Sequence, residues 1–177
     1  MERSICVLSA ILLATAPVLA ADKKASGPHA GHRHGSASLN VSVDGALQIG
    51  LDGPADNLLG FEHAPRNDAQ KKTVARAEQL LRQPAQLFEL PPGAECQAQP
   101  SEVEMKLPAA GSGETHSEVE AQWRWEGARP AALAHVDVGK LFKAFPRLKQ
   151  LDVQIVTPSG QAAAVHKPGA PRVKLAS

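Results

Sequence analysis

The chain has few of the residues that usually build disulfide frameworks, aromatic cores or base-stacking surfaces. Of its 177 residues only 3% are aromatic, none is tyrosine, and only two are cysteine. The hydrophobic core must therefore consist mainly of Leu, Val, Ile and Ala side chains. Cys6 lies in the apolar N-terminal segment, which leaves Cys96 as the only cysteine of the remaining chain. One cysteine excludes an intramolecular disulfide and a cysteine-rich zinc finger within one chain.

A large excess of charge and the common catalytic motifs are absent as well. The formal net charge is +1, and no basic stretch is interleaved with aromatic residues. This pattern argues against nucleic acid as a partner. The sequence contains no G-x-S-x-G, P-loop, glycine-rich dinucleotide turn or H-E-x-x-H motif. We therefore expect a protein that is not an enzyme.

The first twenty residues, MERSICVLSAILLATAPVLA, have the pattern of a secretory signal peptide. A short charged start precedes an apolar run that is too short to span a bilayer comfortably. Val18 and Ala20 place small residues before an expected cut after Ala20. No later segment is apolar enough to cross a membrane. We expect a signal peptide at 1–20 and export to the periplasm of a Gram-negative bacterium.

The rest of the chain is expected to form an arm and one domain. Residues 21–37, ADKKASGPHAGHRHGSA, are small and polar, which is typical of a flexible arm. Residues 38–177 have the length of a single domain with its own core.

Hydrophobic periodicity predicts the elements of this domain. Apolar residues alternate over 39–43 and again over 47–51, and the intervening Asp44-Gly45 indicates a hairpin. The phase of the two runs requires an odd-length loop or a bulge. Asn67 and Gln70 resemble a capping box before a helical stripe that Pro84 closes. We expect an α+β fold with a mainly antiparallel sheet, two hairpins, one long helix (67–83) and one short helix (138–145).

Histidine is the positive signal. Three of the seven histidines, His29, His32 and His34, fall within six positions. In extended backbone His32 and His34 would share one face and could chelate one ion. Zinc takes about four nitrogen, oxygen or sulfur ligands, so the folded domain would have to complete the shell. The alternative is a solvated polar arm that contains histidine incidentally.

Two further histidines are candidate ligands in the domain. His63, in FEHAP, could bind a metal or form a hydrogen bond with the neighbouring Glu62. His116 precedes Glu118 by two positions, so the two side chains would share a strand face. The candidate metal ligands are His29, His32, His34, His63, His116 and Glu118.

The residues leave other functions open. Copper and nickel bind the same kinds of ligand, and copper ranks above zinc in intrinsic affinity. The lack of a methionine cluster weakens the case for cuprous copper. A structural or interaction module with incidental histidines is the third alternative.

Four blocks of the sequence resemble a known family: HAGHRHG, LLGFEHAPRNDAQKKTVARAEQLL, HSEVEAQWRW and LFKAFPRLKQLDVQIVTPSGQ. They are similar to the periplasmic zinc-uptake proteins of the ZrgA type, long catalogued as a domain of unknown function. The resemblance implies an exported accessory protein that binds zinc and works with a zinc transporter. It also implies His32, His34, His63 and His116 as candidate ligands. For any imidazole-rich site we expect loss of affinity as the histidines protonate below about pH 6.5.

This chain departs from that family in two ways. Members often carry a long histidine-rich insertion before the HSE segment, where this chain has only PAAGSGET. Members also tend to have a second cysteine near the position of Gly127, which would pair with the equivalent of Cys96. A single defined zinc site is therefore a better expectation than a high-capacity store.

Overall fold

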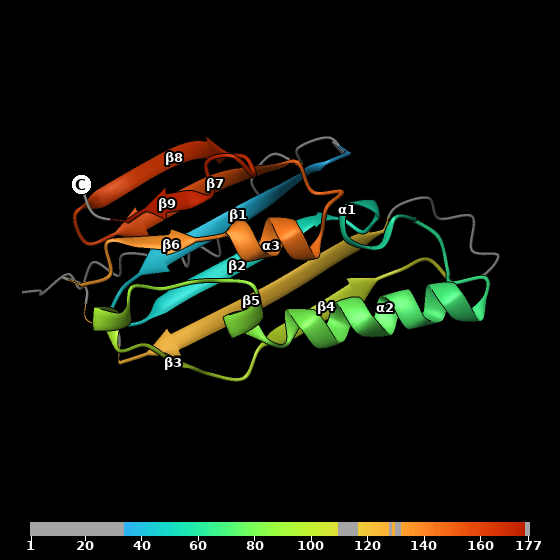
Figure 1. Cartoon of the computed structure of the whole chain (residues 1–177), viewed down its shortest axis with the longest axis horizontal. Coiled ribbons are helices and arrows are strands. Elements are labelled where there is room, and N and C mark those ends of the chain that lie inside the picture. Colours follow the sequence, from blue (N-terminus) through green and yellow to red (C-terminus); the bar gives the residue numbers. More distant parts are fainter. Residues whose placement is uncertain (1–33, 110–116, 128, 130–131, 176–177) are drawn as a thin grey trace, which may run out of the picture. The chain divides into compact units, whose positions relative to one another are not determined.

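A mixed β-sheet of seven strands organises the residues that the computed structural model describes, namely 34–109, 117–127, 129 and 132–175. The strand order is β3-β5-β2-β1-β7-β8, and β4 also pairs with β5 (Figure 1). The strands of this sheet are β1 Ser36–Val43, β2 Leu47–Pro54, β3 Gln97–Ala98, β4 Glu102–Lys106, β5 Glu118–Glu126, β7 Gln150–Thr157 and β8 Gly160–His166. A second, two-stranded sheet pairs β6 (His135–Asp137) with β9 (Arg172–Lys174).

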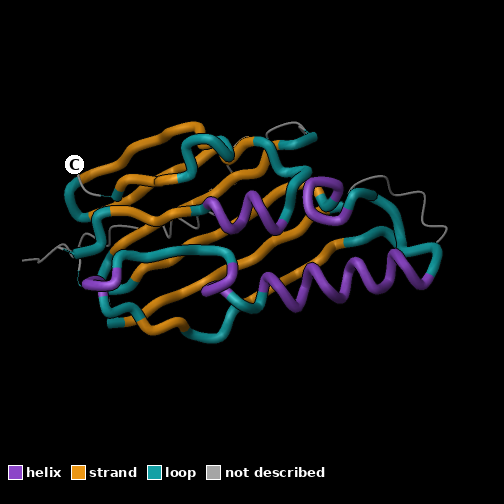
Figure 2. The backbone as a smooth tube through the Cα atoms, viewed as in Figure 1, coloured by secondary structure: helices purple, strands orange, loops and turns teal. Residues whose placement is uncertain are grey.

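The helices and the small sheet lie over one face of the large sheet, as Figure 2 shows. The α-helices are α1 Asp56–Leu59, α2 Asp68–Leu81 and α3 Gly139–Ala144, and two 3-10 turns are η1 Pro84–Gln86 and η2 Pro92–Ala94. The N-terminus of α2 is capped as the sequence predicts, because the Asn67 side chain accepts a hydrogen bond from the Gln70 amide.

Alternation along the strands separates the core from solvent. Leu39, Val41 and Val43 of β1 are buried between more accessible neighbours. On β5 the buried Trp123 donates its indole N–H to the carbonyl oxygen of Leu81 at 2.6 Å, which ties the end of α2 to the sheet. Each large apolar side chain buried in this way contributes about 1.5–3 kcal/mol to folding. The covered face of the sheet is therefore the core, and the opposite face is polar.

The first hairpin forms with the odd-length loop that the phase of its strands requires. Val43 pairs with Leu47, so the loop has three residues, and Gly45 adopts a positive φ of 67°. Glycine tolerates this left-handed conformation because it has no Cβ atom.

The predicted fold class is wrong. Strands make up 42% of the described residues and helices 23%, so the fold is mostly β rather than α+β. The large sheet is mixed, because β1 and β7 pair in parallel, with Leu39 opposite Val153, while its other pairings are antiparallel. Local periodicity indicates that a segment is a strand, but it carries no information about a parallel partner more than a hundred residues away.

The predicted long helix is also corrected, since all three α-helices are short. The longest, α2, has 14 residues and ends before Arg82, because Pro84 begins a separate 3-10 turn. The short helix expected at 138–145 is α3, with six residues. The Asp137 side chain accepts a hydrogen bond from the amide of Gly139, the first residue of α3, at 2.8 Å.

Candidate metal site at one end of the sheet

The face of the large sheet that the helices leave open carries a row of polar side chains. Residues that pair directly across neighbouring strands share a face. Glu104 of β4 lies opposite Glu120 of β5, which lies opposite Asp52 of β2, which lies opposite Ser38 of β1. On the far side of β1, Ser38 lies opposite Asp152 of β7. Carboxylates are therefore concentrated on one side of the sheet.

Three of these carboxylates lie close enough to share a cation. Asp52, Glu118 and Glu120 offer oxygen atoms that all lie within 4.8 Å of one another. Glu118 and Glu120 are alternate residues of β5, so they point to the same face, and Asp52 is the direct partner of Glu120. Asp52 is exposed, whereas the two glutamates are half-buried. The cluster stands near the end of the sheet where β2 ends and β5 begins.

Lys106 occupies the cluster from the neighbouring strand. It lies opposite Glu118, and its Nζ atom forms an ion pair with Glu120 and approaches Glu104 at 4.0 Å. The hydrogen bond to Glu120, with the negative charges of Glu120, Glu104 and Glu118, raises the pKa of Lys106 above its usual value of 10.5. A raised pKa means that Lys106 keeps its charge to a higher pH than a free lysine, so at the alkaline end the pair is lost only as the pH rises through the folded pKa. A cation that binds Glu120 through Oε1 therefore competes with a charged ammonium group.

His34 is the histidine of the N-terminal segment that the structure describes, and it stands at the beginning of β1. The next residue, Gly35, donates its amide hydrogen to the side-chain oxygen of the buried Asn57, whose side-chain nitrogen donates to the carbonyl of Ser36. The imidazole Nδ1 of His34 lies 3.4 Å from Oδ2 of Asp56. A carboxylate at Nδ1 leaves Nε2 as the metal-binding nitrogen, the arrangement common in zinc sites.

Asp56 is itself held by Arg147. The guanidinium Nη2 lies 2.9 Å and 3.1 Å from the two carboxylate oxygens, and Nε donates to the Asp56 carbonyl at 3.1 Å. This fork fixes the carboxylate that faces His34, whose side chain is 70% exposed.

His63 follows α1 and has a local partner. Its Nδ1 lies 2.8 Å from the carbonyl oxygen of Ala64, and its ring stacks on Phe61 with centroids 5.2 Å apart. The structure thus pairs His63 with Ala64 rather than with Glu62, whose Oε1 is buried without a hydrogen-bond partner among the described residues. If Nδ1 donates to the carbonyl, Nε2 remains available for a metal.

The structure brings together only part of the predicted ligand set. Glu118 belongs to the carboxylate cluster, whereas His34 and His63 are not in a cluster of three metal-ligating side chains among the described residues. His29, His32 and His116 lie outside the described residues. Strands β1 and β5 begin, and β2 ends, at the same end of the sheet (Figure 1). The Ala55 amide there donates to the Ser117 carbonyl at 3.1 Å.

Sequence reasoning missed Asp52 and Glu120. Glu120 could have been found, because it lies two residues after Glu118 and therefore on the same face of a strand. Asp52 gives no local signal, since only the pairing of β2 with β5 places it beside the glutamates.

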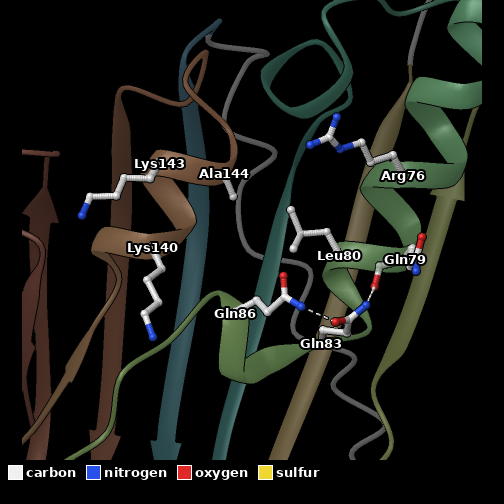
Figure 3. A pocket seen from close by; sticks show the side chains of 8 residues that line it. All are labelled: Arg76, Gln79, Leu80, Gln83, Gln86, Lys140, Lys143 and Ala144. Carbon is white, nitrogen blue, oxygen red and sulfur yellow. Dashed lines mark hydrogen bonds between the residues drawn. The ribbon is translucent and has the colours of Figure 1, made fainter.

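A groove between α2 and α3, shown in Figure 3, has the opposite character. Its volume is about 560 Å³, and its walls carry the cations Arg76, Lys140 and Lys143, with no carboxylate or imidazole among the lining residues. Lys140 forms an ion pair with Glu89, with Nζ and Oε1 3.0 Å apart. This lining is unsuited to a metal cation. The residues that line the groove are Arg76, Gln79, Leu80, Gln83, Gln86, Lys140, Lys143 and Ala144.

Cys96 is not a ligand of the carboxylate cluster. It precedes β3, which pairs with the end of β5 at Glu126, whereas Glu118 begins that strand. Eight residues of extended strand separate these ends by about 27 Å. Burial raises the pKa of the Cys96 thiol, so it stays protonated at neutral pH.

The fold and the cluster define a β-rich protein with a polar sheet face that presents carboxylates suited to a divalent cation. The chain belongs to the ZrgA family of zinc uptake proteins, whose model matches residues 31–175 and confirms the resemblance inferred from the sequence. No curated protein matches the chain. Among the described residues no helix has the length and apolar character to cross a membrane.

Proposed function

We propose that the protein is an exported, non-enzymatic zinc-binding protein that captures zinc for uptake at the end of the sheet where β1 and β5 begin. The observation that carries the proposal is the cluster of Asp52, Glu118 and Glu120, with oxygens within 4.8 Å of one another, in a zinc uptake family. The protein would pass its zinc to a component of a zinc transporter.

Imidazole groups are needed to make such a site selective for zinc. Carboxylates alone suit magnesium, calcium or manganese, whereas added imidazole favours zinc and later transition metals. His34 stands where β1 begins, and along the sequence His116 is two positions before Glu118. The proposed nitrogen ligands come from the set of His29, His32, His34, His63 and His116.

Zinc requires a close approach of the carboxylate oxygens. Zinc–oxygen distances of about 2.0–2.2 Å place the oxygens of a tetrahedral shell about 3.4 Å apart, and the three carboxylates already offer oxygens within 4.8 Å of one another. Rotation of the long Glu118 and Glu120 side chains provides the final adjustment without a change in the strands. Release of Lys106 from Glu120 completes it, and zinc then replaces the ammonium charge.

A competitive zinc titration against a chromophoric chelator tests the proposal. Two variants of the chain carry the test: Glu118→Gln with Glu120→Gln, and His32, His34, His63 and His116 all changed to Ala. The matched control is Glu102→Gln with Glu126→Gln, which removes two exposed strand carboxylates outside the cluster. We expect a near-stoichiometric site of submicromolar Kd in the unmodified chain and the control, weakened at least about a hundredfold in both variants.

Other results would contradict this function. Weak binding of several ions, unchanged in both variants, would leave a structural or interaction module as the better hypothesis. Titration with copper and nickel in the same assay compares the Kd of each metal. Tighter binding of copper alone does not exclude a zinc carrier, because copper ranks above zinc at almost any such site.

Export is tested separately. The protein recovered from the periplasmic fraction of cells that express the full chain should begin at Ala21 when its N-terminus is sequenced. Recovery from the cytoplasm with Met1 intact would contradict the proposed location.

A further inference from the structure

The two edges of the large sheet differ in how they are protected from pairing with another strand. One edge is divided between β3, which has two residues, and β4, which carries Glu102, Glu104 and Lys106. Short strands and edge charges are the devices by which natural sheets avoid edge-to-edge association. The other edge is β8, Gly160–His166, with seven residues, no formal charge on Lys, Arg, Asp or Glu, and no proline.

Strand β8 is also uncovered on both faces. Residues 160–165 are all exposed and His166 is half-buried, whereas β1 shows the buried and accessible alternation of a covered strand. The helical layer therefore leaves this strand open, and within the described residues β8 pairs only with β7. Figure 1 shows β8 at the margin of the sheet. A second strand would meet no obstruction from the described part of the chain.

Exposed apolar surface points to the same place. Val165 is 58% exposed and Val156 46% exposed, the two large hydrophobic residues that stand out among the described ones. Val165 lies opposite Asp152, and Val156 lies opposite Gln161, so both valines are on the open face and on the last two strands. An added strand beside β8 would cover the side chain of Val165.

We propose that β8 pairs antiparallel with β8 of a second copy of this chain, about a two-fold axis at Ala163, and joins the two large sheets into one. In this register Ala163 faces its own copy, and Gln161 faces Val165. Two-fold pairing is isologous, so each contact occurs twice. Lys167, the nearest charge after the strand, faces Ser159 rather than another lysine.

The neutral sequence of β8 favours a second copy over a charged partner. Like charges directly opposite each other destabilise a strand pair, and self-pairing in this register creates none. Pairing along one seven-residue strand buries little surface compared with a standard interface. The dimer should therefore be weak and concentration-dependent.

Sedimentation equilibrium of the full purified chain tests the proposal, with a chelator present so that no metal ion bridges two copies. We expect a reversible monomer–dimer equilibrium. Ala163→Lys places two ammonium groups opposite each other and should raise the dimer Kd about tenfold, since like charges directly opposite each other destabilise a strand pair. Ala163→Glu should do the same.

The proposed register allows a more specific test. Because Ala163 faces its own copy, a mixture of the Ala163→Lys and Ala163→Glu chains should form a heterodimer at least as stable as the unmodified dimer. Gln154→Lys is the matched control, since Gln154 is exposed and pairs with Ala163 one strand inside the edge. It should leave the dimer Kd within about threefold of the unmodified value, as exposed charges contribute little.

Three outcomes would overturn the proposal: a monomer at all concentrations, a dimer that persists in both charged variants, or charged variants that stay monomeric when mixed. Circular dichroism establishes that each variant is folded, which is expected because Ala163 is exposed. Capture of a different neutral strand by β8, with no self-association, would likewise count against a second copy as the occupant.

Discussion

The open face of the sheet and the groove between α2 and α3 carry opposite charges, although the whole sequence has a net charge of only +1. On the open face Asp52, Glu118 and Glu120 share one cluster, and Lys106 pairs with Glu120. In the groove the cations Arg76, Lys140 and Lys143 line the walls without a lining carboxylate. Net charge therefore says little about cation binding, which depends on how the positive and negative side chains are distributed over the surface.

The difference arises from the two periodicities of the chain. In strands every second residue points to the open face, so alternating acidic residues collect there. In the helices the basic residues stand on the faces that the core leaves free. Divalent cations should therefore bind at the open face of the sheet and not in the groove between α2 and α3.

Reversal of one charge in the carboxylate cluster should have the largest effect on zinc affinity. Glu120→Lys would place a second ammonium beside Lys106 and remove a ligand. We expect at least a hundredfold loss of zinc affinity in the competitive titration, because opposed like charges cost several kcal/mol. Thermal unfolding of the variant serves as the control for folding. Zinc affinity within threefold of the unmodified chain would show that zinc binds elsewhere.

A disulfide engineered at the end of β5 opposite to the cluster should have the next largest effect, on the stability of the fold. The pairing of Gln97 with Glu126 places Cys96 opposite Gly127 when it is extended by one residue. Gly127→Cys should therefore form a disulfide with Cys96 under oxidising conditions. We expect the oxidised variant to be about 2 kcal/mol more stable than its reduced form in denaturant unfolding. The gain is moderated because Gly127 has a positive φ of 68°, which disfavours side chains.

A thiol assay of the same variant provides the check on this pairing. Two reactive thiols after oxidation and no change in the unfolding midpoint would contradict it. Zinc affinity should be unaffected, since the disulfide lies at the end of β5 opposite to Glu118.

Removal of the lysine that competes with the metal should increase the difference in cation binding between the open face and the groove. Lys106→Met removes the ammonium group that is paired with Glu120, while the methionine keeps much of the volume. We expect zinc affinity to rise about tenfold, equivalent to about 1.4 kcal/mol. Lys174→Met, which removes an exposed lysine of β9, is the control. An unchanged affinity would mean that Glu120 takes no part in binding.

The smallest effect should come from the groove. Arg76→Gln with Lys143→Gln removes two cations from the covered side of the sheet. Because exposed charges are screened within about 8 Å at physiological salt, zinc affinity should change less than about twofold in the same titration. A larger increase would mean that the two regions are electrically coupled.

Of the carboxylate cluster only Glu118 was among the ligands predicted from the sequence, because it lies two positions after His116 in a strand pattern. The alternation in HSEVEAQWRW is itself a local pattern, and in the structure it buries Trp123 and turns Glu118 to the opposite face of β5. The capping of α2 by Asn67 was likewise readable, since it joins residues three positions apart. The fold class was not, because the balance of strand and helix and the parallel pairing of β1 with β7 depend on contacts between distant segments.

The sequence by itself determined the family, the strand faces and the side of the sheet on which Glu118 stands, because each follows from a motif or from a period of two residues. Tertiary structure alone decided that Asp52 joins Glu118 and Glu120, that Lys106 occupies their site and that β8 ends the sheet unguarded. The physical reason is register: which residues face each other across two strands is settled by how the whole sheet packs against its helices, and no short stretch of sequence contains that information.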